Sequence, residues 1–487
     1  MRRAVIAAII VSLVSGFYNF FIQTPLTLNP NSPSFAVDET FFYAPKVTNP
    51  FHQPGELVPA GLMWLLAKLT GSVVNAFIAA DFIFPSVTFL ALFLLTRSIL
   101  ISLSVLVFYH YLTYFPYLPS VIRLFFHYFQ SGSYWPLIRG FHPQISLGLW
   151  FIFMRRPNWL TLTLLTYTDF FFWTMGFIWL VFRHYFRPLI YWLVLTLPYW
   201  INIISLLPAA DYWQRNYYFV LPTVNQFLVL TFGLNLALWQ KRWRGFYMGV
   251  IVLVAAASIF KFGPDDPIGH WFLRVVNPMT ALLLFTVLFK YLKWPKLLRL
   301  ALITGLLLFQ FRLHWQYFHH NAAAFTIEPE RVQAFTWLKQ NTLTGSIVAA
   351  DMKNSLYLPT YTHNQPYLKQ AQLSQADNHE ILRRFLEIYK IKGVDITTLF
   401  TDNRELIAQK RFDFDQCAGH FLFFRLYNQT NYYSCTLPAS VLEEILTQYQ
   451  QTPAGLTYPA DYWMGTEPID FGILLWENQT YKVYDLR

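Results

Sequence analysis

The amino-acid sequence predicts a polytopic α-helical membrane protein of about eleven spans, followed by a C-terminal α/β domain outside the membrane. Composition is the first reason: 55% of the 487 residues are hydrophobic and 13% are charged, whereas soluble proteins carry nearer a quarter charged residues. Charge distribution is the second, because residues 1–318 hold 22 Lys and Arg against 8 Asp and Glu, and residues 319–487 hold 14 against 18. The basic excess belongs to the apolar part, where it sets membrane topology, and does not indicate a nucleic-acid partner.

The apolar stretches of residues 1–318 predict the individual spans. The first, Ala4 to Phe21, follows two arginines and has no small-residue cleavage site, so we expect an uncleaved anchor. The stretch Leu57 to Thr70 is shorter than the roughly 20 residues that cross a bilayer, and we expect a helix lying at the membrane interface. Further spans are expected at about 73–96, 99–117, 143–154, 158–169, 170–182, 188–206, 219–239, 246–261, 272–289 and 297–317. The pair around Asp169 is alternatively a broken hairpin.

Loop charges orient these spans. Eleven passes that start inside place fourteen Lys and Arg at cytoplasmic ends and eight in outer segments, in agreement with the positive-inside rule. The expected location is therefore the plasma (inner) membrane, with a cytoplasmic N-terminus and residues 319–487 extracytoplasmic. All six loop acids fall outside: Asp38, Glu39, Glu56, Asp211, Asp265 and Asp266. The polar chemistry is thus predicted on the outer face.

Two adjacent carboxylates, Asp38 and Glu39, stand in the first outer loop of a region that otherwise avoids acids. A carboxylate pair beside aromatic and apolar side chains at a membrane surface fits a general base that faces a lipid-borne substrate. A solvated loop turn explains the pair alone equally well.

Residues 319–487 predict a small α/β domain. A helix is expected from Glu328-Pro329, where a proline and acids suit the first turn. The run 346–350 is expected to be a buried strand that ends at Asp351. A second helix is expected over about 378–392, with Asp377 and Glu380 in capping-box spacing and Gly393 as its stop. Later strands are expected at 420–427, 471–476 and 481–484.

Both cysteines of the chain, Cys417 and Cys435, lie in this outer domain on either side of a plausible turn at Asn428-Gln429-Thr430. Two cysteines placed only in an outward domain favour a hairpin disulfide in an oxidising compartment. Two unpaired cysteines remain the alternative.

The run Asp38-Glu39-Thr40-Phe41-Phe42-Tyr43 is similar to the D-E-x-x-Y opening of one branch of the GT-C superfamily of integral-membrane glycosyltransferases, the aminoarabinose and protein O-mannosyl transferases. Phe42 stands where that pattern has its Tyr. Residues 51–57 resemble the Pro-rich entry to the interfacial helix of that branch, but Gln53 replaces a Lys. The helix expected over 334–342 also resembles uncharacterised bacterial members.

The resemblance implies a GT-C-like fold and a glycosyltransferase that moves a sugar from a polyprenyl-phosphate-type lipid donor to an acceptor on the outer face. The acceptor would be a lipid, a glycan or a protein. By position, Asp38 would be the catalytic carboxylate, with Glu39 as the second candidate, and the departure at Gln53 leaves the particular donor open. The resemblance leaves metal dependence open, because some members use a divalent cation such as Mg²⁺ or Mn²⁺ and others use none.

A departing phosphate needs cations or hydrogen-bond donors near the outer surface. Arg139 and Arg215 can each bind a phosphate bidentately, and His142 and His270 can assist; Asp211 lies close to Arg215. Contact with lipid headgroups is the alternative for each arginine.

Asp169 lies deep in apolar sequence, where an ionised group is costly. We expect it to face a polar site with a role in substrate binding, or to bond to a neighbouring helix. Two other classes remain for the whole chain. A lipid or sugar flippase would more often show inverted repeats, which the sequence lacks, and would have no use for the first-loop acids outside its permeation path. A non-catalytic membrane scaffold with an outer binding domain remains the other alternative, since short motifs can survive loss of activity.

Overall fold

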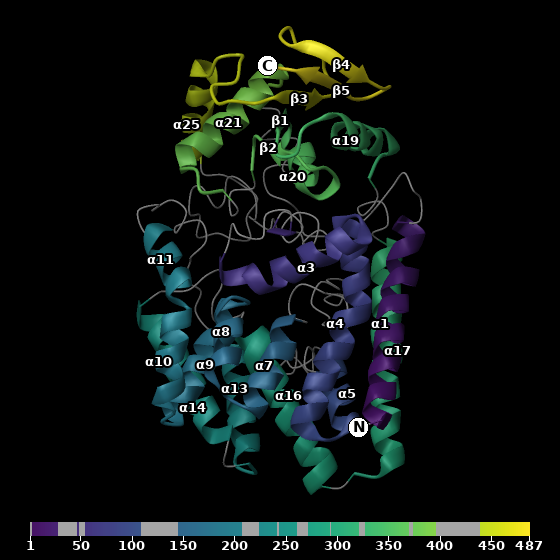
Figure 1. The fold of residues 1–487 in the computed structure, drawn as a ribbon, viewed down its shortest axis with the longest axis vertical. Coiled ribbons are helices and arrows are strands. Elements are labelled where there is room, and N and C mark those ends of the chain that lie inside the picture. The colour runs from purple at the N-terminus through teal and green to yellow at the C-terminus, as the bar shows by residue number, and fades with distance from the viewer. Residues whose placement is uncertain are drawn as a thin grey trace. The chain divides into compact units, whose positions relative to one another are not determined.

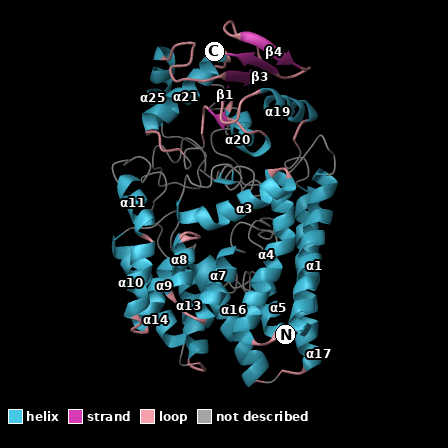
Figure 2. Cartoon of the chain, in the orientation of Figure 1, coloured by secondary structure: helices cyan, strands magenta, loops and turns pink. Residues whose placement is uncertain are grey.

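The computed structural model describes residues 2–27, 46–47, 54–108, 145–206, 224–240, 243–260, 271–292, 294–320, 327–369, 374–395 and 439–487. The chain divides into two compact units. The helices up to α17 form the first unit, apart from the last residues of α1 and α11, and the described residues from Ile327 onward belong to the second. The first unit is helical and the second combines helices with a sheet (Figures 1 and 2). The prediction of a mostly helical chain with a C-terminal α/β part is confirmed.

Most helices of the first unit run upright in Figure 1, whereas α3 lies across them near one end. The bounds are α1 (Arg2–Thr27), η2 (Pro54–Glu56), α3 (Leu57–Thr70), α4 (Val73–Thr96), α5 (Ile99–Phe108), α7 (Ile145–Arg155), α8 (Trp159–Thr166), α9 (Phe170–Phe182), α10 (Phe186–Leu195), α11 (Leu197–Leu206), α13 (Val224–Ala237), α14 (Arg244–Phe260), η8 (Phe272–Val276), α16 (Asn277–Thr286), η9 (Val287–Tyr291) and α17 (Lys296–His320).

Local chemistry explains where several of these helices begin and end. Gly71 ends α3 with a φ of 83°, a conformation that glycine adopts without strain. Ser72 then caps α4, because its hydroxyl accepts the Asn75 N–H at 3.0 Å. Asn158 caps α8 in the same way, at 2.9 Å from the Thr161 N–H. The predicted bounds 57–70, 73–96 and 170–182 coincide with α3, α4 and α9.

The expectation of eleven spans is not supported. Among the described residues, α4 is the one helix long and apolar enough to cross a membrane, and α10 with α11 would give a second if that pair, bent by 57°, forms one span. One reason is that apolar runs form short helices: the run predicted as 188–206 breaks between Leu195 and Leu197, and the runs predicted as 158–169 and 170–182 form the short helices α8 and α9 on either side of the expected boundary at Asp169. Several other predicted spans extend beyond the described ranges.

The second unit is built on a five-stranded sheet of order β2-β1-β3-β5-β4. Strand β1 is parallel to β2 and β3, while β5 is antiparallel to β3 and β4. The bounds are α19 (Pro329–Asn341), β1 (Ile347–Ala350), α20 (Met352–Tyr361), β2 (Gln365–Pro366), α21 (Asn378–Ile391), α25 (Ala439–Gln451), β3 (Tyr462–Gly465), β4 (Ile473–Glu477) and β5 (Lys482–Asp485).

Most of the local predictions for this unit are confirmed. Asp377 caps α21 by accepting the Glu380 N–H at 2.7 Å, and Gly393 follows the helix with a φ of 65°. Helix α19 and strands β1, β4 and β5 lie within one to three residues of their predicted ranges. Helices α20 and α25 and strands β2 and β3 were not predicted, and the strand expected at 420–427 lies outside the described residues.

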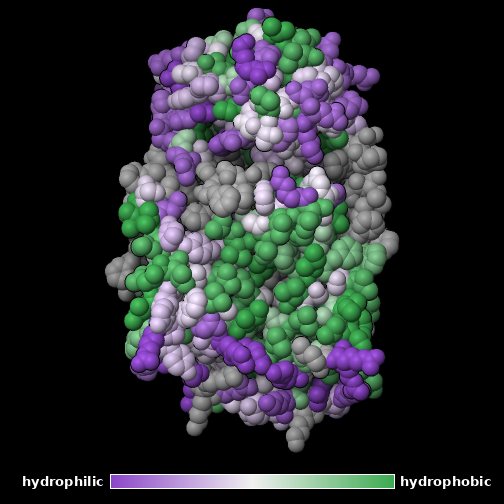
Figure 3. Space-filling view, in the orientation of Figure 1, coloured by the Kyte–Doolittle hydropathy of each residue, from purple (hydrophilic) through white to green (hydrophobic). Residues whose placement is uncertain are grey.

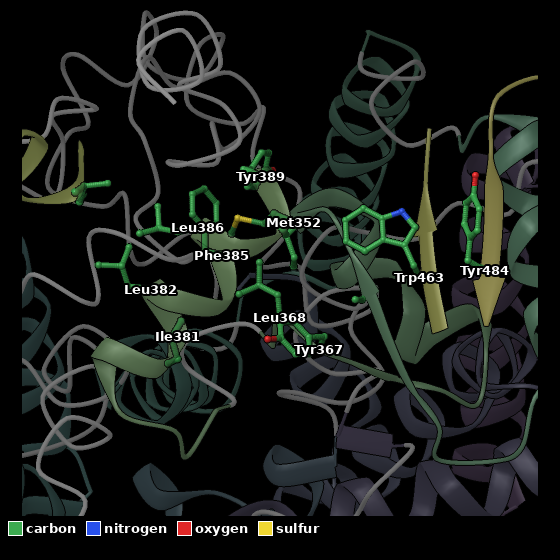
Figure 4. Packing of buried hydrophobic residues seen from close by; sticks show 13 residues of the cluster. Met352, Tyr367, Leu368, Ile381, Leu382, Phe385, Leu386, Tyr389, Trp463 and Tyr484 are labelled. Atoms are coloured by element: carbon green, nitrogen blue, oxygen red, sulfur yellow. The ribbon is translucent and has the colours of Figure 1, made fainter. Parts of the chain in front are cut away.

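Both faces of the sheet are covered by apolar side chains. Strand β3 alternates as a strand must: Trp463 packs in the cluster with α21, while Tyr462 and Met464 pack in the cluster with α19. Figure 4 shows Trp463 and Tyr484 on neighbouring strands facing the apolar side chains of α21. The α/β unit therefore has a layered core of its own.

A largely buried ion pair lies at the carboxyl ends of the parallel strands β1 and β3. Asp351 follows β1 directly, and its carboxylate lies 3.0 Å from the Lys392 ammonium at the end of α21. The half-exposed Glu467, just after β3, lies 3.7 Å from the same ammonium. Burial alone would raise the pKa of Asp351, but Lys392 and the Asn354 N–H outweigh it and hold that pKa below its ordinary value of 3.8. The pair joins α21 to the sheet.

Asp351→Asn is expected to lower the free energy of unfolding of the α/β unit by about 3 kcal/mol, since it leaves a buried ammonium without its main partner. Asn retains the side-chain oxygen that caps α20, so the substitution removes the negative charge without removing the cap. The pKa of Asp351 is lower in the folded state than its ordinary value of 3.8. The ionised carboxylate therefore stabilises the folded unit fully above pH 3.8, and this stabilisation is lost as the pH falls through the lower pKa of the folded state.

Hydrogen exchange of α21 amides in the full chain measures this effect. Glu467→Gln is the matched control and should cost less than about 1 kcal/mol, because that carboxylate is half-exposed. Equal losses of protection in the two variants would show that Asp351 has no special role.

Candidate functional site

Of the side chains predicted to bind substrate or catalyse, Asp169 lies within the described residues. Asp38, Glu39, Arg139, His142, Asp211, Arg215, His270, Cys417 and Cys435 lie outside them. The first-loop acids, the outer cations and the disulfide therefore stay predictions. The site that can be built from described residues is the turn between α8 and α9.

Asp169 begins α9. Its backbone is extended, and its Oδ1 accepts the Phe171 N–H at 2.9 Å, which satisfies one of the free amides at the helix start. Its side chain is 2% exposed. An ionised carboxylate so deeply buried in apolar surroundings requires a close partner.

Arg274 is that partner. Its guanidinium Nη1 donates to the other carboxylate oxygen, Oδ2, at 2.6 Å. Arg274 belongs to the π-helix η8, 105 residues further along the chain. Its guanidinium also lies over the Phe171 ring, with the centroid at 5.2 Å, which favours the cation. One carboxylate oxygen of Asp169 thus bonds to the start of α9 and the other to η8, as expected for a bond between helices.

The same turn anchors α3. The Val58 N–H, in the first turn of α3, donates to the Tyr167 carbonyl oxygen at 2.8 Å. The Tyr167 hydroxyl donates to the Leu195 carbonyl oxygen at 3.1 Å, where α10 breaks before α11. Helix α3 is therefore hydrogen-bonded to the turn that carries Asp169. The Tyr167 hydroxyl bonds the same turn to the break between α10 and α11.

Aromatic side chains surround this turn. Trp173, Trp192, Tyr199 and Trp200, named here the aromatic cluster, pack with ring centroids 5.2–6.3 Å apart. Trp173 lies in the first turn of α9, and the others come from α10 and α11. Edge-to-face and tilted ring contacts stabilise the folded state by more than the burial of their apolar surface alone.

Neighbouring indoles follow one rule: each donates to a threonine hydroxyl. Trp192 donates to Thr166 at 2.8 Å, Trp200 to Thr196 at 3.0 Å, and Trp271, packed beside the turn, to Thr174 at 3.0 Å. Trp173 departs from the rule. Its Nε1 is buried and has no hydrogen-bond partner among the described residues, and the residue is 8% exposed. A buried donor without an acceptor costs about 1–3 kcal/mol.

The chemistry of this turn follows from these contacts. Asp169 is held by an amide and a guanidinium, which suits it to fix a geometry rather than to take a proton. The described residues contain no group of three or more His, Cys, Asp or Glu that could hold a metal ion. Sequence reasoning foresaw a partner for Asp169 but did not identify Arg274, which it placed among the outer cations; the cost of a buried charge was the available signal.

Comparison with known proteins adds no assignment. No protein-family model matches the chain, and no curated protein matches its sequence.

Asp169→Asn is expected to destabilise the helical unit by about 3 kcal/mol, because the cap oxygen remains while Arg274 loses its counter-charge. The double variant Asp169→Asn with Arg274→Met should recover most of that loss, since the guanidinium that lost the carboxylate is removed as well. Thermal unfolding of the purified full chain in detergent measures both. If the single and double variants unfold at the same temperature, the ion pair does not stabilise the turn.

Proposed function

We propose that the chain is an integral-membrane glycosyltransferase of the GT-C type, which transfers a sugar from a polyprenyl-phosphate-type lipid donor to an acceptor on the outer face. In this proposal residues 1–318 form the membrane part and residues 319–487 an extracytoplasmic α/β domain. The shorter apolar helices would act as broken or incomplete spans.

The observation that carries the proposal is α3. It follows the acidic first loop, lies across the upright helices (Figure 1), and is bonded to the Asp169 turn at 2.8 Å. Its buried face holds Pro59, Ala60 and Met63. Its opposite face exposes Leu62, Leu65 and Leu69, the last at 75%. An apolar helix with an uncovered leucine stripe, lying across a bundle, suits the boundary between headgroups and hydrocarbon.

Exposed apolar side chains on other helices support a membrane location. Helix α1 exposes large hydrophobic residues on successive turns, among them Ile6, Ile10 and Val14. The bent pair α10–α11 exposes Ile190, Val194 and Ile201. Figure 3 shows hydrophobic residues over the middle of the helical unit and hydrophilic residues at the end that carries the N-terminus. Contiguous apolar surface of this kind is rare on soluble proteins.

The proposed reaction assigns each predicted residue a task. Asp38 takes the proton of an acceptor hydroxyl, with Glu39 as the second candidate, and the oxygen attacks the anomeric carbon of the sugar. The bond from that carbon to the phosphate oxygen breaks, and polyprenyl phosphate leaves with the electron pair. Arg139 stabilises the phosphate, with Arg215, His142 and His270 as further donors. Asp211 orients Arg215, and a Mg²⁺ or Mn²⁺ ion would be an addition to this scheme. Asp169 and Arg274 hold the turn to which α3 is bonded.

Asp38→Asn is expected to reduce sugar transfer by about 10²–10⁴-fold, because the acceptor hydroxyl loses its base, while membrane insertion is unchanged. Arg139→Ala should weaken use of the donor through lost charge stabilisation. Transfer is measured with reconstituted protein, after mass analysis of lipid-linked sugars and surface glycans in a deletion strain has identified the donor.

Glu39→Gln is the matched control for the choice of base. Wild-type turnover in both Asp38→Asn and Glu39→Gln would exclude the mechanism, and a flippase or a membrane scaffold would then explain the fold better.

Topology provides an independent test. With an inside N-terminus and an odd number of passes, a reporter active only outside the membrane should be inactive when fused after Trp294 and active when fused after His320. The two positions flank α17, which starts at Lys296. Activity at Trp294, or its absence at His320, would contradict an extracytoplasmic α/β domain.

A further inference from the structure

The indole N–H of Trp173 is a buried donor with no acceptor among the described residues. Every other described indole of the aromatic cluster has a threonine acceptor, and each of those hydroxyls also donates to a backbone carbonyl oxygen. Thr166 accepts from Trp192 and donates to the Leu162 carbonyl oxygen at 3.0 Å. Thr196 accepts from Trp200 and donates to the Trp192 carbonyl oxygen at 2.8 Å. Neither hydroxyl accepts a hydrogen bond from the Trp173 N–H, and the described residues offer it no other acceptor.

A water molecule fits this position poorly. A buried water normally makes two to four hydrogen bonds to polar groups, whereas the rings that pack against Trp173 present mainly aromatic surface. The chemistry around the N–H is aromatic instead: Trp200 lies edge-to-face at 5.5 Å, Tyr199 at 6.3 Å, and Trp192 is tilted at 5.7 Å. A ligand that suits such surroundings presents an apolar surface together with a hydrogen-bond acceptor.

Position relates this N–H to the candidate site. Trp173 follows Asp169 by four residues, so both side chains lie at the start of α9 and on the same face of it. Arg274 contacts the same turn through Asp169 and Phe171. The turn before it is bonded to α3. Trp200 is half-buried, so the cluster is not closed on every side.

We infer that, within the proposed glycosyltransferase and resting on that function, the aromatic cluster is a subsite for the sugar ring of the lipid donor. The C–H face of the sugar packs against the aromatic cluster, and the Trp173 N–H donates to a sugar hydroxyl oxygen. The polyprenyl chain offers the indole no acceptor, and the proposed mechanism assigns the phosphate oxygens to Arg139, so the N–H distinguishes a glycosylated lipid from the bare polyprenyl phosphate.

The test is the binding preference for the sugar, measured without an acceptor and therefore without turnover. Full-length protein in detergent is titrated by native mass spectrometry with polyprenyl phosphate and with polyprenyl-phosphate mannose, glucose and N-acetylglucosamine. The wild-type protein should bind at least one glycosylated lipid more tightly than the bare lipid. Trp173→Phe retains an aromatic ring but removes the N–H, and should reduce this preference about fivefold, the worth of one neutral hydrogen bond.

The matched control is Trp179→Phe, a buried indole on the last turns of the same helix whose ring packs on Trp243 at 5.5 Å. It should retain the full preference. Because Trp173 has no hydrogen bond to lose, its variant should unfold at a temperature no lower than that of the control, and both should bind bare polyprenyl phosphate like the wild type.

Three outcomes would overturn the subsite: a wild-type protein without preference for any glycosylated lipid, a Trp173→Phe variant that keeps the wild-type preference, or equal losses for the glycosylated and bare lipids. Failure of the proposed catalytic function is seen separately, as unchanged sugar transfer in Asp38→Asn and Glu39→Gln.

Discussion

The buried ion pair between Asp169 and Arg274, with 2.6 Å between nitrogen and oxygen, is the contact on which the candidate site depends. It fixes the point at which α8 ends and α9 begins, and it ties that point to η8 across 105 residues of sequence. The Val58–Tyr167 bond holds α3 to the same turn, and the aromatic cluster packs around the first turn of α9. Removing one charge would take a close counter-charge from the other in largely apolar surroundings, so the two residues depend on each other.

Sequence periodicity and caps predicted elements whose signals are local. The bounds of α3, α4 and α9 follow from apolar length together with glycine, serine and aspartate at the ends. Strand β3 was missed because it is only four residues long and completely buried, so it lacks the polar–apolar alternation that marks a half-exposed strand. The count of eleven spans is not supported, in part because apolar length does not reveal every helix break: the break at Asp169 was expected, but the one between Leu195 and Leu197 was not.

The site was less predictable than the fold. The cost of burying Asp169 required a partner, but several cations of residues 1–318 could have supplied it, and only the folded packing selects Arg274. The unused N–H of Trp173 is invisible in sequence for a related reason. It becomes unusual only once Trp192 and Trp200 are seen to donate to Thr166 and Thr196. Hydrogen-bond satisfaction is a property of the assembled cluster, not of the residue type.

A broken helix in apolar surroundings must satisfy its own backbone, because lipid offers no hydrogen bonds. The α8–α9 turn meets this condition. The Tyr167 N–H donates to the Thr163 carbonyl oxygen at 3.2 Å, and the Thr168 and Asp169 N–H groups donate to that of Leu165 at 3.0 and 2.9 Å. The Tyr167 carbonyl oxygen accepts from Val58, and the Phe171 N–H is capped by Asp169. Within the proposed membrane location, residues 159–182 can therefore serve as one broken segment whose break is covered by protein, with the start of α3 supplying the donor that a continuous helix would have provided.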